Sequence, residues 1–180
     1  MSWFQAAATG EWCIEHITPI IGATLPPAAY LTRIESAEPV SIGPPAAWVL
    51  QGMRSNQRYT QRAELDRLTA VQAELGRPEA TRAALIPIKK TAAWWQLAQD
   101  ERRAIFEDTS RHIAIGLDYL PAIARRLYHS RDLGEPFDFL TWFEFAPRDS
   151  AQFDDLVARL RATEEWRYIE REVDVRVARP

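Results

Sequence analysis

Hydrophobic and polar positions alternate most regularly in the C-terminal part of the chain. Between residues 137 and 145, aromatic side chains and one threonine occupy every second position, and this period of two predicts a strand. The closing stretch 169–177 repeats the pattern with valines on one face and charged residues on the other. A short apolar run over 84–90 predicts a further strand, in which Pro87 indicates an edge or a bulge.

Two stretches carry a helical period instead. The stretch from Trp94 to Ile115 predicts one helix, which places on a single face Ile105, His112 and Ile115. Ser150 is a good N-cap for a second helix, whose apolar stripe is formed by Phe153, Leu156, Val157 and Leu160. Residues 118–129 look extended. The resulting order is strand, helix, strand, strand, helix, strand, which is typical of the ferredoxin-like split motif.

The first eighty residues are less regular. Strands are predicted within PPAAYLTRIES and over 46–59, and residues 37–47 are predicted to form a loop. Thr60 indicates the start of a helix that ends at Gly76. One side of that helix carries Leu65, Leu68, Val71 and Leu75. These elements look like a second, degraded copy of the same unit.

The predicted fold class is therefore α+β, a duplicated ferredoxin-like fold of the dimeric α/β-barrel type with antiparallel sheets and flanking helices. Residues 1–79 would form the degraded N-terminal half and residues 80–180 the C-terminal half. We find no long linker between them, so the two halves are expected to pack as one unit.

Composition narrows the possible functions. The net charge of −3 and the pI near 5.7 argue against a nucleic-acid partner, because no basic surplus is available to neutralise phosphates. Cys13 is the single cysteine, so no intramolecular disulfide is expected. No apolar stretch is long enough for a membrane span, and the N-terminus lacks the pattern of a secretory signal. We therefore expect a cytoplasmic protein.

One histidine and a pair of adjacent arginines are candidate binding or catalytic residues. His112 lies on an apolar helix face, either as a hydrogen-bonded core histidine or as an axial metal ligand. A lone histidine does not make a zinc site, but it suffices for haem, because the porphyrin supplies the other nitrogens. Arg125 and Arg126 lie on opposite faces of an apolar stretch, and alternation alone does not say which points inward. A buried guanidinium needs an anionic partner, and a substrate is one candidate.

The stretch from Ala47 to the C-terminus resembles the chlorite dismutase family. The resemblance rests on VLQGMRSNQRY, IPIKKTAAWWQL, the helix bearing SRHI, ARRLYHS, DFLTWFEF and LRATEEWRY, and it covers about three-quarters of the chain. It implies the duplicated fold described above and one haem b (iron protoporphyrin IX), bound in the C-terminal half. The short N-terminal portion is similar to the compact branch of the family, so a homodimer is expected.

The resemblance also implies residue roles. His112 matches the proximal iron ligand, and Glu165 matches the acid that hydrogen-bonds its other nitrogen, with Glu164 as a rival. Arg125 matches the distal arginine. The groups that match holders of the haem propionates are Tyr59, Lys90 and Trp94. Trp95 matches an aromatic side chain packed beside the porphyrin, and Glu172 stands where longer members carry a further tryptophan.

The implied activity is the haem-dependent conversion of chlorite to chloride and dioxygen, with Arg125 holding the small anion. Two alternatives remain. A coprohaem decarboxylase of the same superfamily would use a tyrosine at the position that Trp95 occupies here. A haem-binding or sensing protein without turnover would use His112 but would leave Arg125 without an anionic substrate.

Overall fold

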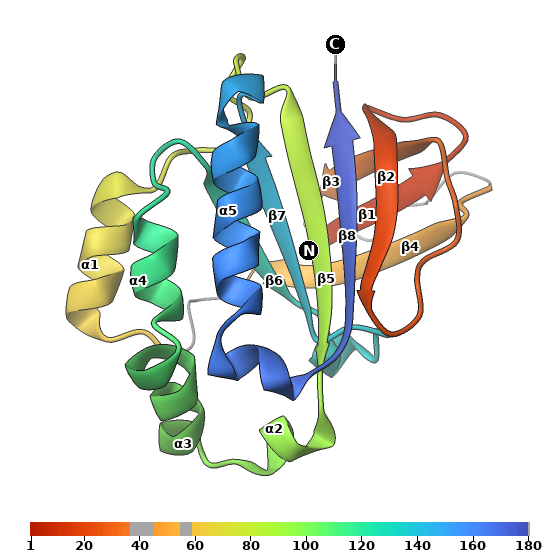
Figure 1. Ribbon diagram of the computed structural model, residues 1–180. Helices are drawn as coiled ribbons and strands as arrows, with labels where there is room; N and C mark the ends of the chain where they lie inside the picture. Colours follow the sequence, from red (N-terminus) through yellow and green to blue (C-terminus); the bar gives the residue numbers. More distant parts are fainter. Residues whose placement is uncertain (37–44, 55–58, 180) are drawn as a thin grey trace.

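The computed structural model describes residues 1–36, 45–54 and 59–179. In this part of the chain, antiparallel strands close into a barrel in the order β1-β3-β2-β8-β5-β7-β6-β4 (Figure 1). The strands are β1 (Ser2–Ala7), β2 (Trp12–Ile21), β3 (Tyr30–Glu35), β4 (Trp48–Arg54), β5 (Arg82–Lys90), β6 (Ala124–His129), β7 (Phe139–Phe145) and β8 (Ile169–Ala178). Most of the loop predicted over 37–47, and residues 55–58 of the strand predicted over 46–59, lie outside the described residues.

The helices gather on one side of this barrel. They are α1 (Arg62–Val71), α2 (Ala92–Gln96), α3 (Gln99–Arg103), α4 (His112–Leu117) and α5 (Ser150–Arg161), and a π-helical turn spans Ala104–Thr109. Figure 1 shows α1, α4 and α5 beside β5, β6 and β7, whereas β1 to β4 lie on the other side of the molecule. The space between this helical layer and the sheet holds the site described below.

The strand order is the same in the two halves of the chain. The C-terminal strands run β8-β5-β7-β6, with helices between β5 and β6 and between β7 and β8, as the split motif requires. The N-terminal strands run β4-β1-β3-β2. Here a short connection joins β1 to β2, where the C-terminal half has helices between β5 and β6. The sequence analysis did not predict β1 or β2.

Side chains that alternate between the two faces of each strand contribute to two hydrophobic cores. One core fills the barrel and includes Trp142, and the other lies under the helices and includes Phe143. Because both faces of β7 and β8 are covered, the charged face predicted for the last strand is also buried: Glu172 is 0% and Asp174 4% exposed. Arg161 of α5 compensates these charges by pairing with both carboxylates, at 2.7 and 3.0 Å.

The helix predicted from Trp94 to Ile115 is wrong as a single element. The segment breaks into α2, α3, the π-helical turn and α4, and Arg111 interrupts it with a φ of 54°, in the left-handed region. The extended segment predicted over 118–129 begins only at Ala124, because α4 and the turns after it occupy the preceding residues. The helix predicted from Ser150 is confirmed, and it follows a 3-10 turn over 147–149.

Pro87 does not mark an edge strand. β5 pairs with β7 on one side and with β8 on the other. Pro87 lies opposite Leu140 of β7, and the paired residues on the β8 side pass from Leu85 directly to Ile88. The missing N–H of the proline is therefore accommodated where the ladder is interrupted.

The helix predicted after Thr60 is present as α1, but it ends at Val71 and not at Gly76, so Leu75 lies outside it. Its apolar stripe is not a buried face. Leu68 is 1% exposed, whereas Leu65 and Val71 are 36% and 43% exposed. The helix thus contacts the rest of the protein through a narrow line of side chains.

Candidate functional site

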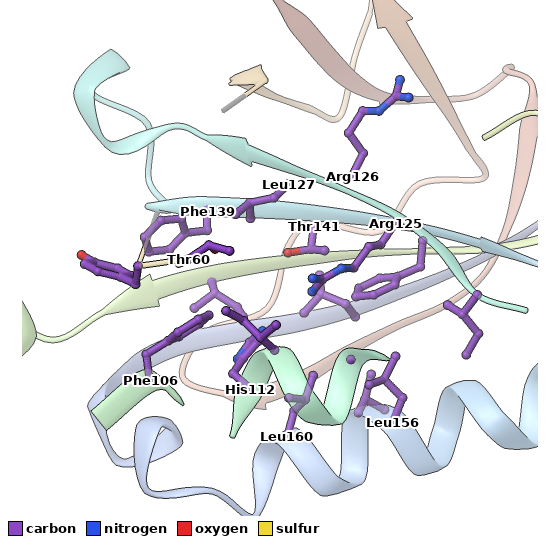
Figure 2. Close-up of a pocket in the computed structure, with 18 of the residues that line it drawn as sticks. Thr60, Phe106, His112, Arg125, Arg126, Leu127, Phe139, Thr141, Leu156 and Leu160 are labelled. Carbon is purple, nitrogen blue, oxygen red and sulfur yellow. The ribbon is translucent and has the colours of Figure 1, made fainter. Parts of the chain in front are cut away.

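A cavity of about 420 Å³ lies between β5, β6 and β7 on one side and α4 and α5 on the other (Figure 2). This volume falls within the range of small-molecule sites, about 300–1,000 Å³. Its walls are mostly apolar and include Ile86, Ile88, Phe106, Leu127, Phe139, Phe143, Leu156, Val157 and Leu160. Charged and polar side chains also line the cavity, among them Lys90, His112, Arg125 and Glu165.

His112 reaches the cavity from the first residue of α4. Glu107 fixes the start of this helix, because its carboxylate accepts hydrogen bonds from the backbone N–H groups of Ile113 (2.5 Å) and Ala114 (3.2 Å). Two aromatic rings lie nearly parallel to the imidazole: Phe106 stacks on it with a centroid distance of 4.4 Å, and Trp166 lies at 6.4 Å. Stacking on Phe106 therefore helps to fix the ring plane.

Glu165 orients the imidazole through a hydrogen bond of 2.7 Å to Nδ1 of His112. Its other carboxylate oxygen pairs with the Lys90 ammonium at 2.6 Å, and both charged side chains are buried. Burial alone raises the pKa of the Glu165 carboxyl, but Lys90 and His112 reverse this effect and lower the pKa to about 2. Glu164, the rival considered from the sequence, instead pairs with Arg167 at 3.1 Å.

The ionised carboxylate determines which nitrogen of His112 is available. A carboxylate only accepts hydrogen bonds, so the proton of the neutral imidazole lies on Nδ1 and is donated to Glu165. Nε2 then keeps its lone pair, and it makes no hydrogen bond with any described residue. An imidazole in this state is a good ligand for a metal ion.

Arg125 enters the same cavity from the opposite wall, on β6 (Figure 2). Its guanidinium forms no hydrogen bond or ion pair with the described residues, and burial lowers its pKa. A methyl group added at Gly116, one helical turn after His112, would lie 3.5 Å from Nη1 of Arg125. The guanidinium therefore extends across the cavity toward α4, as an unpaired cation in apolar surroundings.

Arg126 has the opposite environment. It also borders the cavity, but it points away from His112 (Figure 2) and pairs with Glu35 at 3.3 Å and with Glu74 at 3.4 Å. In the β6–β7 register, Arg125 lies opposite Phe143 and Arg126 opposite Trp142, so the two arginines face the two different cores. This settles which arginine points inward, which alternation alone left open.

Trp94 and Tyr59 also lie in the cavity wall. Trp94 is 1% exposed, and its indole N–H is buried without a hydrogen-bond partner among the described residues. Such a group is costly unless a ligand atom accepts from it. The hydroxyl of Tyr59 lies 3.4 Å from Arg102, and its ring packs edge-on against Trp94 at 6.2 Å.

Lys90 and Trp95, two further predicted residues, relate differently to the cavity. Lys90 lines it, and its ammonium is paired with Glu165 and lies over the Trp94 ring at 4.3 Å; contact with a haem propionate stays a prediction. Trp95 is absent from the described lining residues. It stacks on Phe139, which does line the cavity, and donates to Asp138 at 3.2 Å. Trp95 therefore supports the wall from behind, whereas Lys90 forms part of the wall.

Glu172 lies at the edge of the cavity beneath Trp166. Its carboxylate accepts a hydrogen bond of 2.7 Å from the Trp166 indole and one of 2.9 Å from Arg161. The carboxylate thus holds the indole that packs beside His112. Sequence reasoning missed Trp166, although it directly follows Glu165, and it missed Phe106, for which the sequence offers no signal beyond its aromatic ring.

Comparisons with known proteins agree on one family. The sequence model described as chlorite dismutase matches residues 33–180. The dimeric chlorite dismutase of Nitrobacter winogradskyi is 58% identical, with a TM-score of 0.92, over 99% of this chain and 100% of that chain. The chlorite dismutase of Candidatus Nitrospira defluvii, in complex with imidazole, is 29% identical, with a TM-score of 0.61, over 75% of this chain and 56% of that chain.

A curated relative is matched over a shorter stretch. The chlorite dismutase of Ideonella dechloratans is 35% identical over 86 residues, which are 48% of this chain and 28% of the relative. This chain therefore matches less than a third of that relative's length. No helix in the described part of the chain combines the length and apolar character needed to cross a membrane.

Proposed function

The chain belongs to the chlorite dismutase family, and from this premise we propose that it is a haem-dependent enzyme that converts chlorite to chloride and dioxygen. The observation that carries the proposal is the placement of His112 and Arg125 on opposite walls of one apolar cavity. A metal ligand and an unpaired cation that face each other across such a space suit a planar iron cofactor with an anionic substrate above it.

The residues present fit a haem b. His112 would hold the iron through Nε2, and the apolar walls suit a porphyrin. The buried, unpartnered N–H of Trp94 is a donor suited to a propionate, with Tyr59 beside it. Lys90 also lines the cavity, where it holds Glu165 in place and could contact a propionate. When bound, the haem iron would supply the position at which chlorite coordinates and a chlorine–oxygen bond is cleaved.

The chain's own residues would then perform three tasks. Glu165 keeps the proton of His112 on Nδ1 and strengthens the imidazole as a donor. Arg125 attracts the anion and retains the charged fragment, because a guanidinium stays protonated and offers several N–H donors in a fixed plane. The apolar walls exclude water, so the attraction between this cation and an anion is stronger than in solvent.

Two finer features belong to the same proposal. The identical strand order in the two halves supports a duplicated ferredoxin-like fold, with residues 1–79 as the half that binds no haem and 80–180 as the half that does. A homodimer is supported by the dimeric relative that this chain matches over nearly its whole length. The anion and a second copy of the chain are the partners we propose.

Oxygen evolution from haem-reconstituted protein supplied with chlorite tests the activity. We expect turnover well above that of free haemin, and Arg125→Ala should lower it by about tenfold to a thousandfold, as for other single electrostatic donors. Arg126→Ala is a matched control, because this neighbouring arginine is already paired with Glu35 and Glu74 and points away from His112. Its rate should stay close to that of the wild type.

A rate no better than free haemin, together with normal haem binding, would contradict the proposal and favour a haem-binding protein without turnover. Loss of carboxylate groups from iron coproporphyrin in the presence of peroxide, followed by mass spectrometry, would instead indicate a decarboxylase. The unpaired guanidinium of Arg125 favours the first activity over both alternatives.

A further inference from the structure

Thr141 is a polar residue in the apolar wall that Arg125 shares. It lies on β7, opposite Leu127 of β6 and Ile86 of β5, and all three side chains line the cavity. Figure 2 shows its hydroxyl oxygen in the space beside the Arg125 side chain, above His112. Neither sequence patterning nor the resemblance singled out this position.

The strand register places Thr141 within reach of whatever Arg125 binds. Arg125 pairs with Phe143, and Leu127 with Thr141, so Arg125 and Thr141 are diagonal neighbours on the same face of the sheet. Diagonal neighbours in an antiparallel pair are separated by about 7–8 Å, a gap that a long side chain and a small ligand can bridge. The two side chains come from different strands, so a ligand between them would be held from two directions.

The hydroxyl of Thr141 forms no hydrogen bond with any described residue, although the side chain is half-buried. Threonine hydroxyls inside proteins normally find a partner, commonly a backbone carbonyl. At a position flanked by Leu127 and Ile86, valine would fill the same volume without a polar atom. An unpaired hydroxyl beside an unpaired guanidinium therefore points to a ligand that accepts hydrogen bonds from both.

We propose that Thr141 is a specificity-determining residue whose hydroxyl donates a hydrogen bond to the anion held by Arg125. This inference rests on the proposed function for the identity of the anion as a small oxyanion. The guanidinium supplies the charge and the hydroxyl supplies a second, directional contact. An anion that accepts a hydrogen bond from each donor would engage both groups, whereas an apolar ligand would not.

The test compares Thr141→Val, which removes only the hydroxyl, with Thr141→Ser, which keeps it, in haem-reconstituted protein. Fluoride is the probe, because it is a small anion that binds ferric haem and accepts hydrogen bonds, and its affinity is read from the absorption spectrum. We expect Thr141→Val to bind fluoride about tenfold to a hundredfold more weakly, the usual effect of losing a hydrogen bond to a charged group. Thr141→Ser should stay within about threefold of the wild type, because the donor remains.

Thr18→Val, at an exposed position on β2, is the matched control and should leave the affinity unchanged. Fluoride affinity equal to that of the wild type in Thr141→Val would overturn the proposal, as would an equal loss in the Val and Ser variants. The oxygen measurement on wild-type protein separates the two claims. If the wild-type protein evolves no oxygen but Thr141→Val still binds fluoride more weakly, the contact between Thr141 and the anion is supported and the proposed activity is refuted.

Discussion

The buried ion pair between Lys90 and Glu165 leads to a strong prediction for the protein without cofactor. The two groups lie 2.6 Å apart, and their side chains are 4% and 5% exposed. Lys90→Met would leave the Glu165 carboxylate buried with the His112 hydrogen bond as its remaining described partner. Glu165→Leu would leave the ammonium without its nearest anion.

Removing one partner of a buried pair costs about 3–5 kcal/mol, because the remaining charge keeps its desolvation penalty. In a protein of this size, each kcal/mol shifts the midpoint of thermal unfolding by about 2–4 °C, so each single variant should unfold about 6–20 °C lower. The double variant Lys90→Met/Glu165→Leu leaves neither charge. It should lose only about 1–3 kcal/mol, mainly for the unpaired N–H of His112.

Urea unfolding of the cofactor-free protein, followed by tryptophan fluorescence, measures all three values. Lys89→Met is the control, because Lys89 forms an exposed pair with Glu170 at 2.8 Å and should contribute at most about 1 kcal/mol. Additive losses in the double variant, or a single-variant loss no larger than that of Lys89→Met, would refute the argument that the site is held by a buried charge pair.

Three further outcomes follow from the contacts. Gly116→Leu should weaken haem binding by about fivefold to a hundredfold in a haem titration, since it overpacks the cavity; Gly116→Ala, whose methyl would lie 3.5 Å from Arg125, should be tolerated. Trp94→Phe should speed haem loss to a scavenging apoprotein by about tenfold or more, because it removes the buried indole donor. Hydrogen bonds from Arg103 lower the pKa of the Glu64 carboxyl. Glu64→Gln should therefore cost about 1 kcal/mol at neutral pH, and this difference should shrink as the pH falls through the lowered pKa of the Glu64 carboxyl.

The sequence predicted the C-terminal strands well because their period of two is dictated by burial on alternating faces, as in β7. It did not predict β1 and β2, because β2 carries charged residues and a proline within an irregular pattern. It also merged α2 to α4 into one helix. Nothing in the local pattern shows that Arg111 adopts a left-handed conformation or that Glu107 caps the following turn.

The candidate site was predicted in part. His112 and Arg125 were chosen correctly as residues that share a cavity, and Glu165 rather than Glu164 contacts His112. The pairing of Lys90 with Glu165 joins residues 75 positions apart, and no periodicity carries that information. The same holds for Thr141, because an isolated hydroxyl in an alternating strand has a meaning only once its neighbours across the sheet are known.

The most direct test is a crystal structure of the haem-reconstituted protein. We predict a porphyrin in the cavity between α4 and β6, with iron bound to Nε2 of His112 and the Arg125 side chain on the opposite face of the macrocycle. Iron bound by any other side chain, or His112 and Arg125 on the same face of the porphyrin, would refute the proposed site.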